Sequence, residues 1–230
     1  MAMMRPAPLP ISRPAHSGVF ARLEPKGEWT AAAYPDGFRK LFGVQICDME
    51  WTEALTYVEL ISNLRQNPRT LSFIDGQTAL RLPIDADCRA VLGNRILLPA
   101  SRTLALMARW QGGGPLKTSF DAARFVDALL TFVPRCHVAL VGSRFARLDA
   151  TRQHLSQHAP WHMFSIVRAA DIGGGIVENS AVAGFVGAVP DLVIVDADGY
   201  EDEARFEKAV GLRHNGLIVM AGAAFDNRNS

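Results

Sequence analysis

The sequence predicts an α/β protein whose sheet is mainly parallel and carries helices on both faces. Short apolar runs alternate with helical segments from residue 42 onward, which is typical of parallel strands that are buried on both sides. Of the 230 residues, 49% are hydrophobic and 20% are charged, an ordinary globular composition with ample material for a core. We therefore expect a Rossmann-like architecture.

Residues 1–38 are predicted to form an arm that packs little, because they are rich in proline and lack a sustained hydrophobic period. Residues 39–230 are predicted to form one α/β domain, with an N-terminal lobe at 39–132 and a Rossmann-like lobe at 133–230. The first residues lack the apolar stretch of a signal peptide, and no apolar run approaches the roughly 20 residues of a spanning helix. We expect a cytoplasmic protein.

The N-terminal lobe shows short apolar strands separated by segments with helical periodicity. Phe42–Ile46 is a predicted strand, and Asp48 is a predicted cap for the helix that follows. In chain order we expect a strand at 42–46, a helix at 51–64 ended by Asn67-Pro68, a strand at 70–74, a helix at 85–92, a strand at 95–98 and a helix at 104–110 that stops at Gly112-Gly113-Gly114.

The second lobe has a clearer alternation of strand and helix. His137–Gly142 is a buried-type strand that ends in a glycine, and Pro190 precedes another apolar strand. In chain order we expect a helix at 122–132, a strand at 137–142, a helix at 148–158, a strand at 161–167, a helix at 177–186, a strand at 192–195, a helix at 201–210 and a strand at 217–221.

Charge and cysteine content exclude several classes of function. Twenty-four basic residues face 23 acidic ones, so no global field attracts nucleic acid. Cys47, Cys88 and Cys136 are far apart and form no CxxC pair. We expect core thiols in a reducing compartment, without a disulfide framework or a metal site.

Two strand ends are candidate ligand sites, since ligands of parallel sheets bind beyond the carboxyl ends of the strands. Gly142 and Ser143 follow one strand, where a glycine lets the backbone approach a phosphate; the glycine can equally serve only a turn. Asp196 and Asp198 follow another strand, where they could hold a divalent ion, bind a ribose or act as a base, or only form a turn and a helix cap. If a nucleotide binds here, Asp196→Ala should weaken its binding.

The order of short motifs resembles the WecG/TagA/CpsF family of bacterial glycosyltransferases. The matching segments cover about residues 41 to 226: Phe42-Gly43-Val44, Glu53-Ala54-Leu55, Arg69 to Asp75, Asp87 to Leu92, Leu97-Leu98-Pro99, Gly114-Pro115-Leu116, Val138 to Gly142, Pro190 to Val195, Glu203 and Val219 to Asp226. The resemblance implies transfer of a hexosyl or N-acetylhexosaminyl group from a UDP-sugar to a lipid diphosphate-linked acceptor. It implies no metal and no further cofactor, and a place at the inner face of the plasma membrane.

The polar motifs depart from that family. Asp75 stands where the family has Asn, Ala100 where it has the proposed base, and Arg124 where it has a site Asp; Glu203 is retained. The chain also stops at Ser230, near where the family adds a closing segment. A sugar hydroxyl needs a base, so the candidates are Asp75, Asp121 or Asp196. The other expected substrate-binding residues are Gly142, Ser143, Asp198 and Glu203.

Three functions remain open from the sequence. The first is a glycosyltransferase of surface-polysaccharide synthesis, although we expect little or no transfer with the family's usual substrates. The second is an inactive nucleotide-sugar-binding or regulatory protein on the same fold, as a homo-oligomer or paired with an active transferase. The third is an S-adenosylmethionine-dependent methyltransferase, because Pro190 to Asp198 and Asn215 to Val219 look like the corresponding strands of that class.

Overall fold

The computed structural model describes residues 37–63, 68–112, 114–168, 189–197, 199–211 and 214–222. Residues 1–36 of the predicted arm, the predicted helix at 177–186 and Asp198 lie outside these ranges. Within them, no helix has the length and apolar character needed to cross a membrane.

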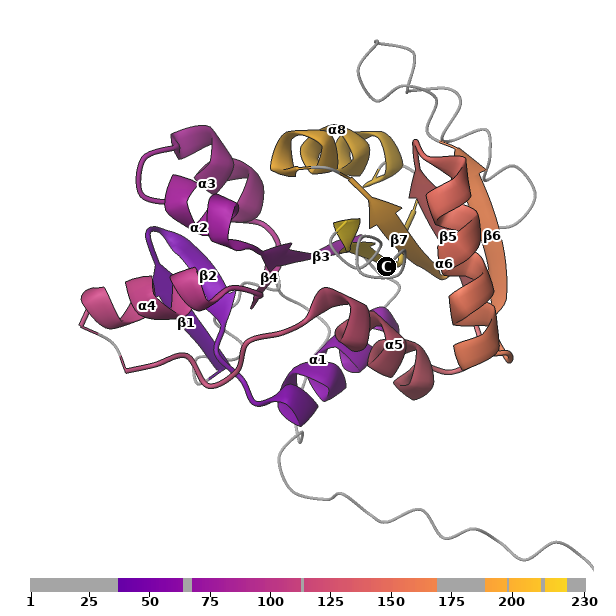
Figure 1. Cartoon of the computed structure of the whole chain (residues 1–230), viewed down its shortest axis with the longest axis horizontal. Coiled ribbons are helices and arrows are strands. Elements are labelled where there is room, and N and C mark those ends of the chain that lie inside the picture. The colour runs from indigo at the N-terminus through magenta and orange to yellow at the C-terminus, as the bar shows by residue number, and fades with distance from the viewer. Residues whose placement is uncertain are drawn as a thin grey trace, which may run out of the picture. The chain divides into compact units, whose positions relative to one another are not determined.

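An eight-stranded sheet forms the centre of the domain (Figure 1). The strand order is β1-β2-β4-β3-β8-β7-β5-β6, and only the β1–β2 pair is antiparallel. The strands are β1 Phe38–Leu41, β2 Val44–Cys47, β3 Arg69–Ile74, β4 Ile96–Pro99, β5 His137–Gly142, β6 Met163–Arg168, β7 Leu192–Asp196 and β8 Leu217–Met220. The predicted mainly parallel α/β sheet is confirmed.

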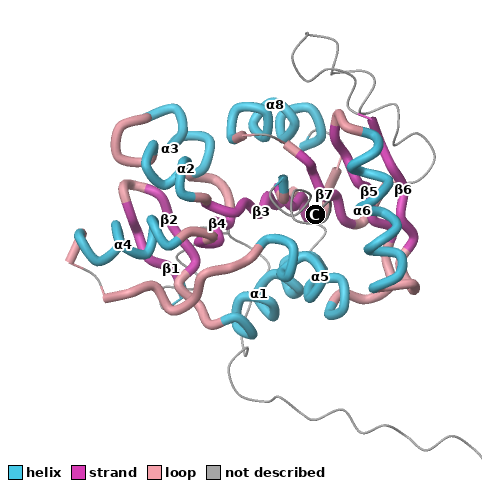
Figure 2. Tube along the Cα trace, in the orientation of Figure 1, coloured by secondary structure: helices cyan, strands magenta, loops and turns pink. Residues whose placement is uncertain are grey.

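Helices cover both faces of the sheet (Figure 2). The helices are α1 Trp51–Asn63, α2 Gly76–Arg81, α3 Ala86–Leu92, α4 Arg102–Trp110, α5 Ala122–Phe132, α6 Phe145–His158 and α8 Tyr200–Gly211. One core layer joins α1, α5 and α6 to the sheet. On the other face, α2, α3 and α4 cover the N-terminal strands, and Phe206 of α8 packs on the later ones.

The start of the domain differs from the sequence prediction. Phe42 and Gly43 form the turn of a β1–β2 hairpin, with φ of 49° and 91°, so the expected strand at 42–46 begins only at Val44. A positive φ suits glycine and is uncommon for other residues, which explains why the turn sits here. The prediction also missed β1 and α2, and it began α6 about one turn late.

Asp48 does not cap α1, contrary to the prediction. Its carboxylate accepts a hydrogen bond from the Lys117 backbone N–H at 2.8 Å and pairs with Arg39 at 2.6 Å. The Glu53 carboxylate instead accepts from the Glu50 N–H at 3.0 Å, next to the first turn of α1. Asp48 therefore ties the hairpin to the segment that leads from α4 to α5.

The path of the chain creates a reversal between β5 and β7. From β5 the chain continues to β6 on one side, and then returns to β7 on the other. β8 follows and pairs with both β7 and β3, so it joins the two halves of the sheet. Such a reversal leaves a crevice at the carboxyl ends of the strands in many α/β proteins.

Candidate functional site

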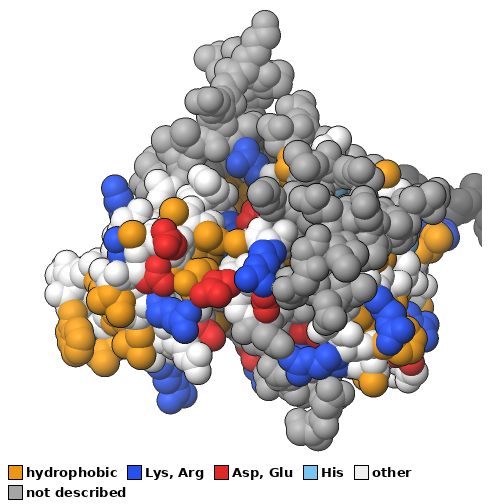
Figure 3. Space-filling model, turned by 90° about the horizontal axis from the view of Figure 1, so that it is seen from above, with side chains coloured by type: hydrophobic (Ala, Val, Ile, Leu, Met, Phe, Trp, Pro, Cys, Tyr) orange, Lys and Arg blue, Asp and Glu red, His pale blue; other side chains and the backbone are white. Residues whose placement is uncertain are grey.

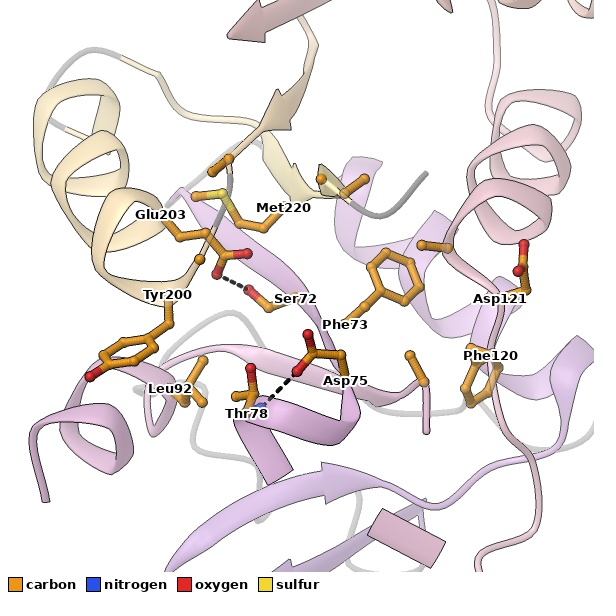
Figure 4. Close-up of a pocket in the computed structure, with 16 residues that line it drawn as sticks. Ser72, Phe73, Asp75, Thr78, Leu92, Phe120, Asp121, Tyr200, Glu203 and Met220 are labelled. Carbon is orange, nitrogen blue, oxygen red and sulfur yellow. Dashed lines mark hydrogen bonds between the residues drawn. The ribbon is translucent and has the colours of Figure 1, made fainter. Parts of the chain in front are cut away.

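A pocket of about 360 Å³ lies at the carboxyl ends of four strands, β3, β4, β7 and β8 (Figure 4). The starts of α2, α5 and α8 complete its wall. The lining residues are Ser72, Phe73, Asp75, Thr78, Leu92, Ala100, Phe120, Asp121, Ala122, Ala197, Gly199, Tyr200, Glu203, Met220, Ala221 and Gly222. A concave site of this size at this edge of a parallel sheet is where an α/β protein binds small molecules.

Asp75 enters the pocket from the end of β3. Its Oδ1 accepts a hydrogen bond from the Thr78 N–H at 2.7 Å and so caps α2, while its other oxygen faces the cavity (Figure 4). Ile74 pairs with Pro99, and the Ala100 N–H donates to the Ile74 carbonyl at 2.9 Å. Asp75 and Ala100 therefore follow neighbouring strand ends and lie side by side.

Asp121 reaches the pocket from the start of α5. The Phe120 N–H donates to the Pro99 carbonyl at 2.7 Å, which fixes this segment against the end of β4. The Phe120 ring stacks on Trp51 at a centroid distance of 5.4 Å and is buried. Asp121 itself is exposed, and its Oδ1 caps α5 by accepting from the Arg124 N–H at 2.9 Å.

Glu203 supplies a third carboxylate from α8. The buried Arg95 guanidinium contacts it at 2.5 Å, and the Ser72 hydroxyl donates to it at 3.5 Å (Figure 4). Its side chain is 14% exposed, on the pocket side. Burial raises the pKa of Glu203 above its ordinary value, and Arg95 opposes part of that rise.

Arg95 anchors α8 to the sheet. Its fully buried guanidinium also pairs with Glu207 at 2.8 Å and donates to the Ser72 hydroxyl at 3.0 Å. Thr70 of β3 donates to the same Glu207. A buried arginine shared by two carboxylates needs all of these partners, since an unpaired buried charge is strongly unfavourable. The network therefore fixes where Glu203 stands.

Tyr200 closes the opposite wall of the pocket. Its hydroxyl donates to Asp85 Oδ2 at 2.8 Å, and Arg81 lies 5.6 Å from its ring centroid. The hydrogen bond to Asp85 raises the pKa of Tyr200 to about 12. The hydrogen bond from the Cys88 N–H, followed by that from Tyr200, lowers the pKa of Asp85. Tyr200 is therefore a protonated phenol at neutral pH and cannot serve as a base there.

The pocket is acidic. Asp75, Asp121 and Glu203 contribute carboxylates, whereas the described residues of the lining include no lysine, arginine or histidine. Arg95 lies behind the wall and is already shared between two glutamates. Among the described residues, no group of three or more histidine, cysteine or acidic side chains is arranged to hold a metal ion. The lining suits hydroxyl groups or a cation better than a bare anion.

The reversal between β5 and β7 holds the other predicted site residues. Gly142 pairs with Asp196, which is buried and contacts Arg147 of α6 at 2.9 Å. Arg147 also donates to the Gly222 carbonyl at 2.6 Å. Gly142, Ser143 and Asp196 are not among the residues that line the pocket. The structure thus brings Asp75, Asp121 and Glu203 together and places the Gly142–Asp196 pair apart from them.

Sequence reasoning missed Ser72, Arg95 and Tyr200. Arg95 could have been found, because it directly precedes an apolar strand. An arginine in such a place is buried only if it has charged or polar partners, so its position predicts an ion-pair network. Ser72 lies within an apolar strand, where a lone hydroxyl is equally compatible with a role in the core. Tyr200 gave no signal that separates it from other half-buried aromatic residues.

The comparisons with known proteins identify no family for this chain. No model of a known protein family matches it, and no curated protein matches it either. The parallel sheet and the acidic pocket are properties of the structure itself. The resemblance to the WecG/TagA/CpsF glycosyltransferases rests on the sequence motifs alone.

Proposed function

We propose that the pocket binds a nucleotide-sugar and that the protein is a glycosyltransferase of the hexosyl or N-acetylhexosaminyl type. The observation that carries the proposal is the pair of carboxylates, Asp75 and Asp121, which line the same pocket as Ala100. Position 100 is where the resemblance places the base. The donor would be a UDP-sugar and the acceptor a lipid diphosphate-linked sugar, at the inner face of the plasma membrane.

Asp75 is the better candidate for the base. It lies beside Ala100, one oxygen is fixed by the Thr78 N–H, and the other faces the cavity. A carboxylate held in this way can accept the proton of an acceptor hydroxyl as the hydroxyl attacks the anomeric carbon and UDP leaves. Asp121 and Glu203 would accept hydrogen bonds from other sugar hydroxyls.

The charge of the pocket decides how the ligand is oriented. Three carboxylates repel a diphosphate but accept hydrogen bonds from hydroxyl groups. We therefore assign the acidic lining to the sugar and expect the diphosphate to lie away from Asp75 and Glu203. In this respect the pocket differs from sites in which arginine or lysine side chains bind the phosphates.

A ligand screen followed by an assay tests the proposal. The melting temperature is measured with UDP, UDP-hexoses, UDP-N-acetylhexosamines and S-adenosylmethionine; a ligand at about 100 times its Kd adds roughly 2.7 kcal/mol to the free energy of unfolding. UDP release is then followed with a lipid diphosphate-linked acceptor. We expect turnover with these usual substrates of the family to be low, and we expect Asp75→Asn to lower it by a further factor of about 10² to 10⁴. Failure of every UDP compound to bind would overturn the proposal.

A non-catalytic binding protein is the second candidate, and one observation favours it. Asp75 and Asp121 both cap helices, so each has a structural reason to be acidic without any chemistry. Binding of a UDP-sugar without turnover would establish this alternative, with the protein acting as a homo-oligomer or beside an active transferase. Binding of S-adenosylmethionine alone would support the methyltransferase instead.

A further inference from the structure

The outer surface of α2, of the turn that follows it and of α4 exposes large apolar side chains. Leu80 is 60% exposed, Ile84 83%, Leu106 49% and Trp110 79%. α2 and α4 pack against each other, so Leu80 and Ile84 lie in a segment next to the helix that carries Leu106 and Trp110. Hydrophobic side chains gather there at the left of Figure 3. We call Leu80, Ile84, Leu106, Trp110, Arg102 and Arg109 the α2–α4 face.

Helix α4 places its apolar and basic residues on the same exposed side. Leu104 and Ala108 face the core, whereas Arg102, Leu106, Arg109 and Trp110 are all exposed. Leu106 and Trp110 are four residues apart and so neighbour each other on the helix. An exposed helix side normally carries polar residues, so a leucine and a tryptophan beside two arginines indicate a surface that meets a partner.

The charged residues of this face, Arg102 and Arg109, are both basic, although the whole chain is nearly neutral and Asp85 and Asp87 closely follow Ile84. The stretches 76–84 and 100–120 contain no acidic residue, and the second includes Arg102 and Arg109. Within the part of the chain that the structure describes, neither arginine forms an ion pair with a carboxylate. Two unpaired cations beside exposed tryptophan and leucine complement an anionic, partly apolar partner.

We propose that the α2–α4 face binds the surface of an anionic lipid bilayer. Tryptophan prefers the boundary between headgroups and acyl chains, and arginine attracts anionic headgroups. An amphipathic helix with such residues lies in the plane of the interface without spanning the membrane. Thr78 of α2 lines the pocket, two residues before Leu80, so the pocket wall and the lipid-facing surface share one helix. This proposal does not depend on what the pocket binds.

Vesicle co-sedimentation tests it. The full chain is mixed with vesicles of phosphatidylcholine alone or of phosphatidylcholine with phosphatidylglycerol. We expect binding to the anionic vesicles only, and weaker binding as salt concentration rises. Arg102→Gln and Arg109→Gln should each lower the partition coefficient about fivefold. Trp110→Ser should lower it further, and because Trp110 is exposed this variant should keep its fold, which its circular dichroism melt checks.

A matched control distinguishes binding through this face from non-specific adsorption to vesicles. Phe132 on α5 is 47% exposed and lies outside the α2–α4 face, so Phe132→Ser should leave vesicle binding unchanged. Equal binding to both vesicle types, or binding that survives the Trp110 and arginine changes, would overturn the proposal. So would a dimer in sedimentation equilibrium that Trp110→Ser converts to a monomer, since the face would then be covered by a second copy.

Discussion

Two strand ends at the carboxyl edge of the sheet look alike in sequence and differ in structure. At β3, Asp75 follows an apolar strand and lies beside Ala100, and the space above this pair opens into the pocket. At β7, Asp196 ends an apolar strand and lies beside Gly142, yet Asp196 is buried against Arg147, and Asp196 and Leu148 fill the space next to Gly142. The neighbouring helix thus decides whether a carboxylate at a strand end faces a ligand or a buried partner.

The largest expected change in the free energy of unfolding is at the end of β7, where Asp196 is buried. Asp196→Ala leaves Arg147 buried without this carboxylate, and breaking a buried ion pair in this way costs about 3–5 kcal/mol. Urea denaturation measures the loss. The double variant Asp196→Leu with Arg147→Met should recover much of it, because it removes both charges together. If Asp196→Ala unfolds like the wild type but loses ligand affinity, the distinction between the two strand ends is wrong.

Gly142→Ala is expected to act through packing. A Cβ at this position would lie 2.9 Å from the Asp196 Cβ and 3.2 Å from both the Asp196 carbonyl oxygen and the Leu148 Cδ2. Crowding of this kind costs about 1–3 kcal/mol. Gly199→Ala is the matched control, because its Cβ would meet no atom within 4 Å. Thermal unfolding of both variants provides the comparison, and equal melting temperatures would show that β5 and β7 are not tightly packed here.

At the end of β3, two variants of Asp75 should have different effects on stability but the same effect on ligand binding. Asp75→Ala removes the cap of α2 and should cost about 1 kcal/mol, whereas Asp75→Asn can still accept from the Thr78 N–H. Both variants lack the carboxylate that faces the pocket, so both should lose ligand affinity. Isothermal calorimetry and urea denaturation measure the two properties. An Asn variant that both binds the ligand and turns it over as well as the wild type would leave Asp75 only its structural role.

The smallest expected effect is the pH dependence of Glu203. Because the folded protein raises the pKa of Glu203, ionisation costs more in the folded state than in the unfolded state. The cost is absent below the ordinary pKa of 4.5 and grows as pH rises through the raised value. As pH rises through that window, the free energy of unfolding of the wild type should therefore fall relative to that of Glu203→Gln. Urea denaturation at several pH values measures this difference. A relative loss for Glu203→Gln with rising pH would mean that Arg95 outweighs burial.

Periodicity predicted most of the later elements, because strands buried on both faces have a strong apolar signal. α5 spans 122–132 and β5 spans 137–142, as expected. The short elements were missed: β1 has the mixed residues Phe-Arg-Lys-Leu, and α2 is only six residues long. Such segments owe their structure to tertiary packing, which local sequence does not encode.

The site was only partly predictable. Asp75, Asp121 and Glu203 were among the predicted candidates and line one pocket, but their meeting there depends on β3, β4 and β8 being neighbours. Strand order is a long-range property that no local motif specifies. From sequence alone Asp196 is as good a candidate as Asp75. Only the fold places Arg147, 49 residues earlier in the chain, beside Asp196, where the two form a buried ion pair.

The position of β8 has a consequence for biosynthesis. The strands β1, β2, β4 and β3 form one ribbon and β7, β5 and β6 another, and β8, at residues 217–220, bonds to the inner edge of each. A nascent chain that has not yet delivered these residues from the ribosome therefore displays two unsatisfied strand edges. Open edges of this kind pair readily with other chains. Insertion of β8 covers both edges at once and so ends the aggregation-prone stage of folding.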